Sequence, residues 1–399
     1  MGGTGMDFRF TESEERLRQE LRAFLKETLP PDWQGLGSEI SDDDWEFGQW
    51  FNKKLAERGW IAPAWPKEYG GLGATYIEQA IFGEELAYHR APNGGRIFGV
   101  GMIGPTLIVH GTEEQKRRHL PGITRGEVLW CQGYSEPGAG SDLASLQTRA
   151  VRDGDEYVIN GQKIWTTQAH RAHWMFLLAR TDPNAPKHRG ISFFLLDMKT
   201  PGITVRPIIN MADRHEFNEV FFEDVRVPKE NLVGGENRGW YVAMTLLDFE
   251  RSSIGASAAS RRTLEELAQF ARDERVGGNG ARIIDRGWVR QGLAERFIEV
   301  EVARWMSYRV ASMQQRGQVP NYEASMVKVF ATEAAQRMYH FGTKVLGLYG
   351  QLRPGSKYAP LFGRIEQGYL TSVAPTIYSG TSEIQRNIIA TRGLGLPRD

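Results

Sequence analysis

The sequence has a single cysteine and no feature that would attach the chain to a membrane or to nucleic acid. Cys131 is the one cysteine among 399 residues, which excludes an internal disulfide and suits a reducing compartment. Lys plus Arg and Asp plus Glu both number 49, so charge gives no case for a polyanionic partner. No apolar run approaches the roughly 18 residues of a membrane span, and the first residues lack a signal-peptide core. We therefore expect a cytoplasmic protein without membrane insertion or nucleic-acid binding.

The first 125 residues have the pattern of a helical domain. Thr11 and Glu14 can form a capping box, because the hydroxyl and the carboxylate each satisfy a backbone N–H at a helix start. Leucines at helical spacing follow, and further helices are predicted over residues 43–58 and 75–89. A helix that starts after Thr112 should end at Pro121.

The stretch "GVGMIG" at residues 99–104 fits the G-x-G-x-x-G spacing of a dinucleotide site. That site needs a preceding strand and an acidic residue about 20 positions further on within a βαβ unit. The neighbourhood here is helical and offers neither, so the glycines are better explained by close helix packing.

Strand patterns replace helical ones between residues 126 and 238. "HWMFLLAR", "GISFFLLDM", "GITVRPI" and "NEVFFEDVRV" are typical of strands. Asp153-Gly154 and Asn160-Gly161 predict hairpin turns. Strands do not alternate with helices, so a doubly wound parallel sheet is not expected.

After Gly239 the helical period returns, over residues 240–273, 285–317 and 322–347 and in a C-terminal helix near Thr381. The predicted fold class is α+β. It has an N-terminal helical domain (1–125), a middle β-barrel or β-sandwich domain (126–238) and a C-terminal four-helix bundle (239–399).

Two motifs in the middle region suit a flat, polar-edged ligand. "YSEPGAGSDLAS" is rich in glycines that let backbone N–H groups approach a ligand, and "KIWTT" places an aromatic ring beside two hydroxyls on a predicted strand. On spacing alone, an ordinary glycine turn and a core tryptophan are the favoured interpretation.

Together with "GTEEQKRRHLP", "VPKENLVG" and "YSGTSEIQR", these motifs resemble the acyl-CoA dehydrogenases, in the family's order and over nearly the whole chain. The resemblance implies bound FAD and oxidation of an acyl-CoA thioester to a 2,3-enoyl-CoA, with a hydride passed to flavin N5. Electrons would then go to an electron-transfer flavoprotein. Carried over by position, the residues implied at the cofactor are Gln132, Tyr134, Ser135, Trp165, Thr167, Gly347, Thr381 and Glu383. Those implied at the substrate are Ser141, Asp248, Arg251 and Ser379.

The position of the catalytic base departs from many members of the family. Ser379 stands where they have the glutamate that removes the α-proton, and a hydroxyl is too weak a base for that step. The family's second base position corresponds to Glu250, which shares a helical stripe with Leu246, Leu247 and Ile254. Partial desolvation on such a stripe would raise the pKa of the carboxyl. The alternative is an ion pair with a nearby arginine.

Small residues in 252–260 are expected to leave room for a bulky acyl chain.

Two segments depart from the family where neighbouring subunits share FAD. "KVLGLYG" has Lys344 and Leu348 in place of a Gln and a Gly, and "ARDERVGGNGARIIDR" replaces an Arg-x-x-Phe-Gly segment. Some bacterial relatives are heterotetramers of two paralogous subunits, and this chain resembles those subunits in its altered segments. We therefore expect a homotetramer or a heterotetramer with a paralogous subunit. The alternatives are a flavin oxidase or monooxygenase on the same fold and a non-catalytic subunit. No metal site is expected.

Overall fold

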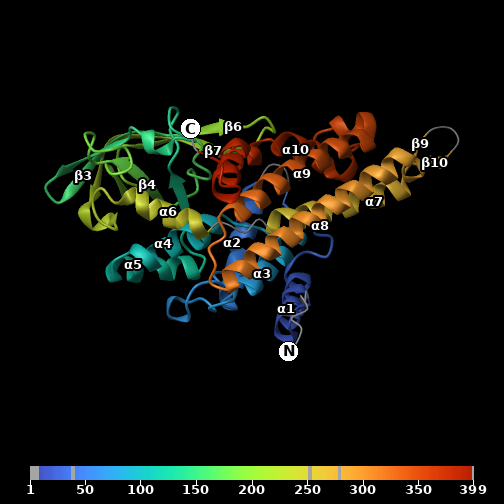
Figure 1. Ribbon diagram of the computed structural model, residues 1–399, viewed down its shortest axis with the longest axis horizontal. Coiled ribbons are helices and arrows are strands. Elements are labelled where there is room, and N and C mark those ends of the chain that lie inside the picture. Colours follow the sequence, from blue (N-terminus) through green and yellow to red (C-terminus); the bar gives the residue numbers. More distant parts are fainter. Residues whose placement is uncertain (1–8, 37–40, 250–253, 277–279, 398–399) are drawn as a thin grey trace.

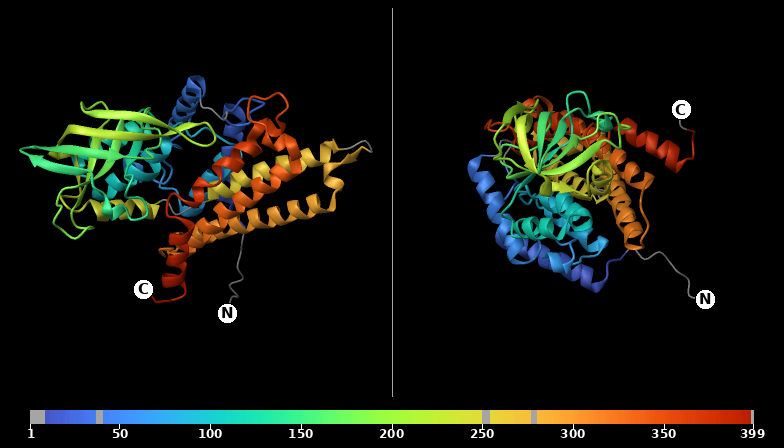
Figure 2. Two further views of the ribbon diagram at one scale, coloured as in Figure 1. Left: turned by 90° about the horizontal axis from the view of Figure 1, so that it is seen from above. Right: turned by 90° about the vertical axis from the view of Figure 1, so that its left-hand side faces the viewer.

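The computed structural model describes residues 9–36, 41–249, 254–276 and 280–397. A strand-rich region lies at one end of the molecule and long helices lie at the other (Figure 1). The left view of Figure 2 shows the same separation from above, and the right view looks along the long axis with the sheet in front. The predicted α+β class, with helices first, a sheet next and a helical bundle last, is confirmed.

Capping boxes define the starts of the N-terminal helices. The side chains of Thr11, Ser41, Thr75 and Thr112 each accept a hydrogen bond from the backbone N–H three residues on. The helices of this region are α1 (Glu12–Thr28), α2 (Asp42–Glu57), α3 (Tyr76–Tyr88), α4 (Gly104–His110) and α5 (Glu113–Thr124).

The prediction that Pro121 ends the last of these helices is wrong. Pro121 lies inside α5, which continues to Thr124. A proline removes one backbone donor, but its carbonyl still accepts the Arg125 N–H at 3.1 Å. The helix ends instead beside Gly126, whose φ of 68° lies in the left-handed region that glycine favours.

The glycines of "GVGMIG" serve helix packing, as predicted. The segment forms a wide helical turn, Phe98–Ile103, that leads directly into α4. A Cβ on Gly104 would overlap the indole of Trp65, and a Cβ on Gly99 would lie 3.2 Å from Cγ2 of Ile123. Bare backbone is therefore needed where the helix contacts these side chains.

The middle region is a mixed sheet in the order β6-β7-β3-β2-β4-β5-β8, with β1 paired to β4. β4 runs parallel to β1 and β2 and antiparallel to β5. The strands are β1 (Trp130–Gly133), β2 (Arg149–Asp153), β3 (Glu156–Lys163), β4 (Trp174–Arg180), β5 (Ile191–Asp197), β6 (Ile203–Ile209), β7 (His215–Pro228) and β8 (Leu232–Val233).

One of the two predicted hairpin turns is confirmed. Asp153 pairs with Glu156 across the turn from β2 to β3, and Gly154 has a φ of 62°. The turn at Asn160-Gly161 is wrong, because both residues lie within β3, at a register shift in its pairing with β7. A Cβ on Gly161 would lie 2.7 Å from Cα of Thr148, so this glycine allows a bulge and a close strand approach.

The centre of the sheet, at β4 and β5, is buried on both faces. Phe176 and Leu178 of β4 pack with the N-terminal helices, while Met175 and Leu177 pack on the opposite face. This two-sided burial explains the unbroken apolar run of β4, because alternate side chains enter different cores.

The C-terminal region is helical, and α7, α8 and α9 pack together with a separate core. The predicted helix over 240–273 is described on both sides of residues 250–253, which lie outside the described part. The helices are α6 (Gly239–Phe249), α7 (Ile254–Asp273), α8 (Gly287–Gln315), α9 (Tyr322–Leu346), α10 (Arg364–Thr371) and α11 (Ser382–Ile388). A short hairpin, β9 (Arg275–Val276) and β10 (Ala281–Arg282), forms the far tip of the bundle (Figure 1).

A buried network of charges joins the N-terminal helices to the bundle. Glu84 and Glu85 of α3 contact Arg18 of α1 at 2.9 Å and 2.5 Å. Glu84 also contacts Arg304 of α8 and accepts a hydrogen bond of 2.6 Å from Tyr308 Oη. The network therefore links three helices from distant parts of the sequence.

We expect the stabilisation by Glu85 to be lost as the pH falls from about 5 towards 2. Burial opposes ionisation of this carboxyl, but hydrogen bonds from His89, Arg22 and Arg18 lower its pKa to about 2. A carboxyl whose folded pKa lies below the unfolded value, about 4.3, stabilises the fold above that value. In urea unfolding between pH 3 and 6, the difference in unfolding free energy between wild type and Glu85→Gln should narrow at low pH. A pH-independent difference would contradict this assignment.

Candidate functional site

Two chain segments meet beside the sheet and carry half of the predicted cofactor residues. One segment follows β1 at residues 134–136, and the other follows β3 at residues 164–168. The Ile164 N–H donates to Ser135 O at 2.9 Å. The two segments therefore form one continuous surface.

A buried ion pair lies behind this surface and supports it. Lys163, which is fully buried, lies 2.8 Å from Glu136 and donates to Tyr134 O at 3.0 Å. Glu136 also accepts the backbone N–H groups of Gln147 (2.6 Å) and Thr148 (2.9 Å). Burial lowers the pKa of Lys163 to about 8, although the Glu136 carboxylate opposes this shift. The pair thus joins β3, the glycine-rich turn and the segment before β2.

The surface itself combines an exposed ring with half-buried polar groups. The Trp165 side chain is 56% exposed, and Gln132, Ser135 and Thr167 are half-buried. β3 ends at Lys163, so the prediction that "KIWTT" lies on a strand is wrong for Trp165 and the threonines, which follow the strand. The chain leaves the strand there because Trp165 takes a φ of 60°.

Tyr134 does not place its hydroxyl on this surface. Its ring packs edge-on to Phe176, with 5.7 Å between centroids, and the side chain is 6% exposed. Within the described residues, its buried Oη has no hydrogen-bond partner. Tyr134 therefore offers the surface its backbone alone.

The glycine-rich turn that carries Ser141 is open to solvent. Ser141 is exposed, and a Cβ on Gly138 or Gly140 would meet no atom within 4 Å. The neighbouring Asp142 forms an ion pair of 2.8 Å with Lys187, which fixes one end of the turn. The turn can thus receive a ligand without rearranging.

The C-terminal residues form a second group, in α11 and in the segment that precedes it. Ser379 is exposed, with a φ of 51°, and its carbonyl accepts a hydrogen bond from Gln385 Nε2 at 3.3 Å. Thr381 caps α11 by accepting the Ile384 N–H at 3.2 Å. The backbone N–H of Glu383 and the hydroxyl of Thr381 lower the pKa of the exposed Glu383 carboxyl.

An open groove of about 330 Å³ lies beside this second group. The Lys328 ammonium, from α9, donates a hydrogen bond to the backbone carbonyl of Gly380, the residue before Thr381. The groove is lined by Glu333, Gln336, Arg337, Thr376, Ile377, Ser382, Glu383 and Arg386.

The remaining predicted residues are exposed or only partly described. Gly347, with a φ of 61°, is exposed at the end of α9, and the neighbouring Leu348 side chain is 83% exposed. Asp248 lies in α6, whereas Glu250 and Arg251 lie outside the described residues. Ser135, Trp165 and Thr167 therefore lie on the two joined segments, with Gln132 in the adjoining β1, whereas Ser379, Thr381 and Glu383 lie at the start of α11.

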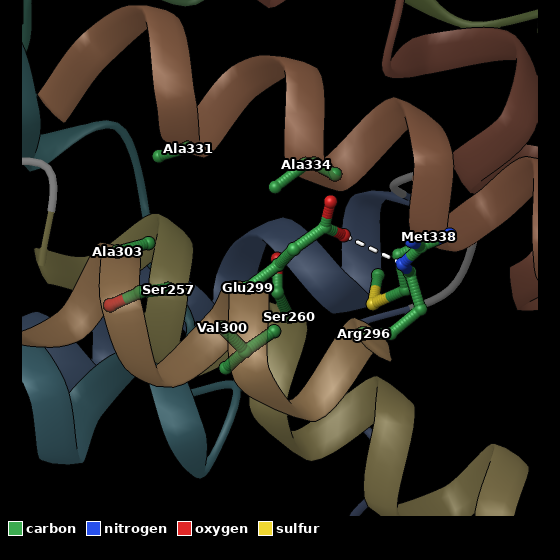
Figure 3. A pocket seen from close by; sticks show the side chains of 10 residues that line it. Ser257, Ser260, Arg296, Glu299, Val300, Ala303, Ala331, Ala334 and Met338 are labelled. Carbon is green, nitrogen blue, oxygen red and sulfur yellow. Dashed lines mark ion pairs between the residues drawn. The ribbon is translucent and has the colours of Figure 1, made fainter. Parts of the chain in front are cut away.

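A small cavity lies between α7, α8 and α9, beside part of the segment expected to leave room for an acyl chain (Figure 3). Its volume is about 10 Å³, and it contains an Arg296–Glu299 ion pair of 2.6 Å. Ile254, Ser257 and Ala258 are each 3% exposed. Ile254, Ser257 and Ala258 therefore serve close helix packing, whereas Ala256 is exposed and residues 252–253 lie outside the described part. The lining residues are Ser257, Ser260, Arg296, Glu299, Val300, Ala303, Ala331, Ala334, Ala335 and Met338.

Sequence reasoning missed the residues that support the Trp165 surface. Lys163, Glu136 and Asn218 are buried polar residues in strand-like or glycine-rich contexts. A lysine or an asparagine at an inward position of an alternating strand is the signal that could have identified them. In the described part of the chain, no group of His, Cys, Asp and Glu side chains is arranged to hold a metal ion. No helix within that part is long and apolar enough to cross a membrane.

Comparisons with known proteins agree over the whole chain. Sequence models of the acyl-CoA dehydrogenase N-terminal, middle and C-terminal domains match residues 11–127, 131–225 and 237–394. Acyl-CoA dehydrogenase FadE26 of Mycobacterium tuberculosis is 38% identical over 403 residues, which cover 98% of this chain and 99% of that protein.

Two solved structures are similar in fold and in sequence. The Tcur3481-Tcur3483 steroid ACAD has a TM-score of 0.89 and 36% identity, covering 99% of this chain and 100% of that chain. The ChsE4-ChsE5 complex from Mycobacterium tuberculosis has a TM-score of 0.88 and 37% identity, with the same coverage. The chain therefore belongs to the acyl-CoA dehydrogenase family of flavin-dependent oxidoreductases.

Proposed function

We propose that this chain binds FAD and dehydrogenates an acyl-CoA thioester between its α and β carbons, giving a 2,3-enoyl-CoA. The observation that carries the proposal, within the family assignment, is the exposed Trp165 indole beside half-buried Gln132, Ser135 and Thr167. A flat apolar side chain with polar groups beside it can contact both the face and the polar edge of an isoalloxazine ring. FAD supplies the hydride acceptor when bound. Electron-transfer flavoprotein is proposed as the electron-accepting partner.

Glu250 is the proposed base for the α-proton. It falls between α6 and α7, outside the described residues, so the assignment rests on the sequence. In the sequence, Glu250 falls at helical spacing from apolar residues and at the family's second base position. Ser379 contributes its backbone N–H to the thioester carbonyl, because a backbone donor does not depend on the side chain. Asp248, Arg251 and Ser141 are proposed to contact the CoA moiety and the acyl arm.

The proposed substrate carries a bulky, polycyclic acyl group. One similar structure is described as a steroid ACAD, and its TM-score of 0.89 extends over nearly the full chain. Ile254, Ser257 and Ala258 are buried in helix packing, so the exposed Ala256 and the neighbouring residues 252–253 are the part of this segment proposed to face the acyl chain. A panel of steroid-CoA, long-chain and short-chain thioesters separates these substrate classes.

The proposed assembly is a heterotetramer with a paralogous subunit. Both similar structures are named as two-component complexes. Leu348 and Tyr349, in the altered "KVLGLYG" loop, are 83% and 59% exposed. Apolar side chains exposed in a cofactor-sharing segment are consistent with cover by a second chain. A homotetramer is the alternative, and co-expression with gel filtration distinguishes the two.

The decisive experiment is anaerobic titration of the purified flavoprotein with the acyl-CoA panel. Wild type should bleach the visible flavin absorbance, and Glu250→Gln should bleach at least about 10²-fold more slowly because it lacks the base. Retained CoA binding by the variant, measured by calorimetry, controls for folding. Equal rates would remove Glu250 from the mechanism.

The two alternatives give different results in the same experiment. A flavin oxidase would bleach and then recover rapidly in air without electron-transfer flavoprotein. A non-catalytic subunit would carry no FAD when purified alone and would not bleach with any thioester.

A further inference from the structure

The segment that forms the Trp165 surface has an unusual backbone. Trp165 and Gln168 have φ values of 60° and 56°, in the left-handed region that side chains with a Cβ disfavour. They flank Thr166 and Thr167, so the segment is bent at both ends. Burial does not hold Trp165 in place, since its side chain is 56% exposed. Such geometry persists when the surroundings fix it.

Strand β7 supplies those surroundings with three consecutive residues. Asn218 O accepts the Thr166 N–H at 3.0 Å, and Asn218 Nδ2 donates to Thr166 O at 3.0 Å. Glu216 O accepts the Gln168 N–H at 2.8 Å. The ring of Phe217 meets the Trp165 indole edge-on, with 6.0 Å between centroids. Both backbone groups of Thr166 are thus held by one asparagine.

The amide of Asn218 is itself fixed in orientation. It is fully buried, its Nδ2 also contacts His170 Nδ1 at 3.2 Å, and its Oδ1 contacts His215 Nε2 at 2.8 Å. The two imidazoles stack with 4.0 Å between centroids. Burial, and then the charges of His215 and Arg171, lower the pKa of His170 to about 4. At neutral pH His170 is therefore uncharged, and in its Nε2–H tautomer Nδ1 accepts a hydrogen bond from the amide.

We infer that Asn218 is a positioning residue: its side chain clamps residues 165–168 in the bent conformation that presents the Trp165 indole and the Thr167 hydroxyl to the flavin. The contacts of β7 hold the segment bent before a ligand binds, so FAD binding does not have to bend it. The identity of the ligand rests on the proposed function. The clamp itself rests on the contacts of β7.

Two measurements test the clamp on the full chain in the assembly that it forms. In Asn218→Ala, FAD should bind the flavin-free protein at least about tenfold more weakly, because the competent segment conformation becomes a minor one. Hydrogen exchange of peptides covering residues 164–170 should also quicken by at least about tenfold. The absorbance shape of any bound flavin should change, since its neighbouring wall is displaced.

The matched control is Asn52→Ala. Asn52 is 1% exposed and, like Asn218, donates to a backbone carbonyl, that of Gly94 at 3.0 Å. This variant should lose stability but keep the wild-type FAD affinity.

A second pair of variants covers the case in which Asn218→Ala does not fold. His170 reaches solvent although part of its ring is desolvated against His215, so its variants should fold. His170→Leu removes the acceptor for Asn218 Nδ2 and should weaken FAD binding, whereas His170→Gln can restore an acceptor and should recover it.

Wild-type FAD affinity in both Asn218→Ala and His170→Leu would overturn the clamp. If wild type itself takes up no FAD, the proposed function fails, and exchange alone then decides the clamp. Unchanged exchange of residues 164–170 in Asn218→Ala would overturn it.

Discussion

Replacing Glu84 by alanine should lower the free energy of unfolding by about 3–5 kcal/mol. The carboxylate is 6% exposed and contacts the guanidinium groups of Arg18 and Arg304 as well as the Tyr308 hydroxyl. Its removal leaves two buried cations with less compensation, and water has little access to replace the lost charge. The loss should also loosen α3 from α8, because Glu84 is the shared partner.

Urea unfolding of wild type and Glu84→Ala measures this cost. The matched control is Glu57→Ala, which breaks an exposed pair with Lys54 at 2.8 Å and should cost less than about 1 kcal/mol. Equal costs for the two variants would show that the buried network does not stabilise the fold.

Lys163→Met should also cost about 3–5 kcal/mol, and it should weaken FAD binding as well. The methionine nearly matches the buried volume but leaves the Glu136 carboxylate without its cation. Glu136 then has the Gln147 and Thr148 N–H groups as its remaining described partners. The Tyr134 carbonyl also loses its donor, so the turn after β1 should move away from residues 164–168.

A compensating double variant separates charge from packing in this pair. Lys163→Met with Glu136→Leu removes both charges, so stability should recover by more than half relative to Lys163→Met. Thermal unfolding and FAD titration are measured on the same samples. A double variant no more stable than Lys163→Met would show that backbone contacts, not charge, make the pair important.

Local signals in the sequence predicted much of the fold. The capping boxes at Thr11, Thr75 and Thr112 start helices where expected, because each depends on residues three positions apart. The four strand-like runs of the middle region became strands. Failures occurred where a distant segment decides the outcome: Gly161 looks like a turn residue until Thr148 of the preceding segment lies against it.

In the candidate site too, local motifs could be predicted from the sequence and contacts with distant segments could not. The residues carried over from the family motifs fall into two spatial groups, and their roles stay predictions, as do the domain boundaries. A lysine or an asparagine at an inward strand position signals a structural role, but the partner of Asn218 was not predictable locally, since Asn218 lies 52 positions from Thr166. α10 was also missed, because it is short and its Arg364 pairs with Glu266 of a different helix.

The two-sided burial of the sheet limits how this protein can be divided or exchanged. Phe176 and Phe193 belong to the same cluster as Leu21 and Leu55 of the first two helices. A fragment that begins after residue 125 would therefore present an uncovered aromatic sheet face, which favours aggregation. In chimaeras with relatives, residues 9–249 should therefore be exchanged together as one unit. The bundle has its own core but must stay compatible with α3, because Glu84 contacts Arg304 of α8 and Ala80 packs with Ile254 of α7.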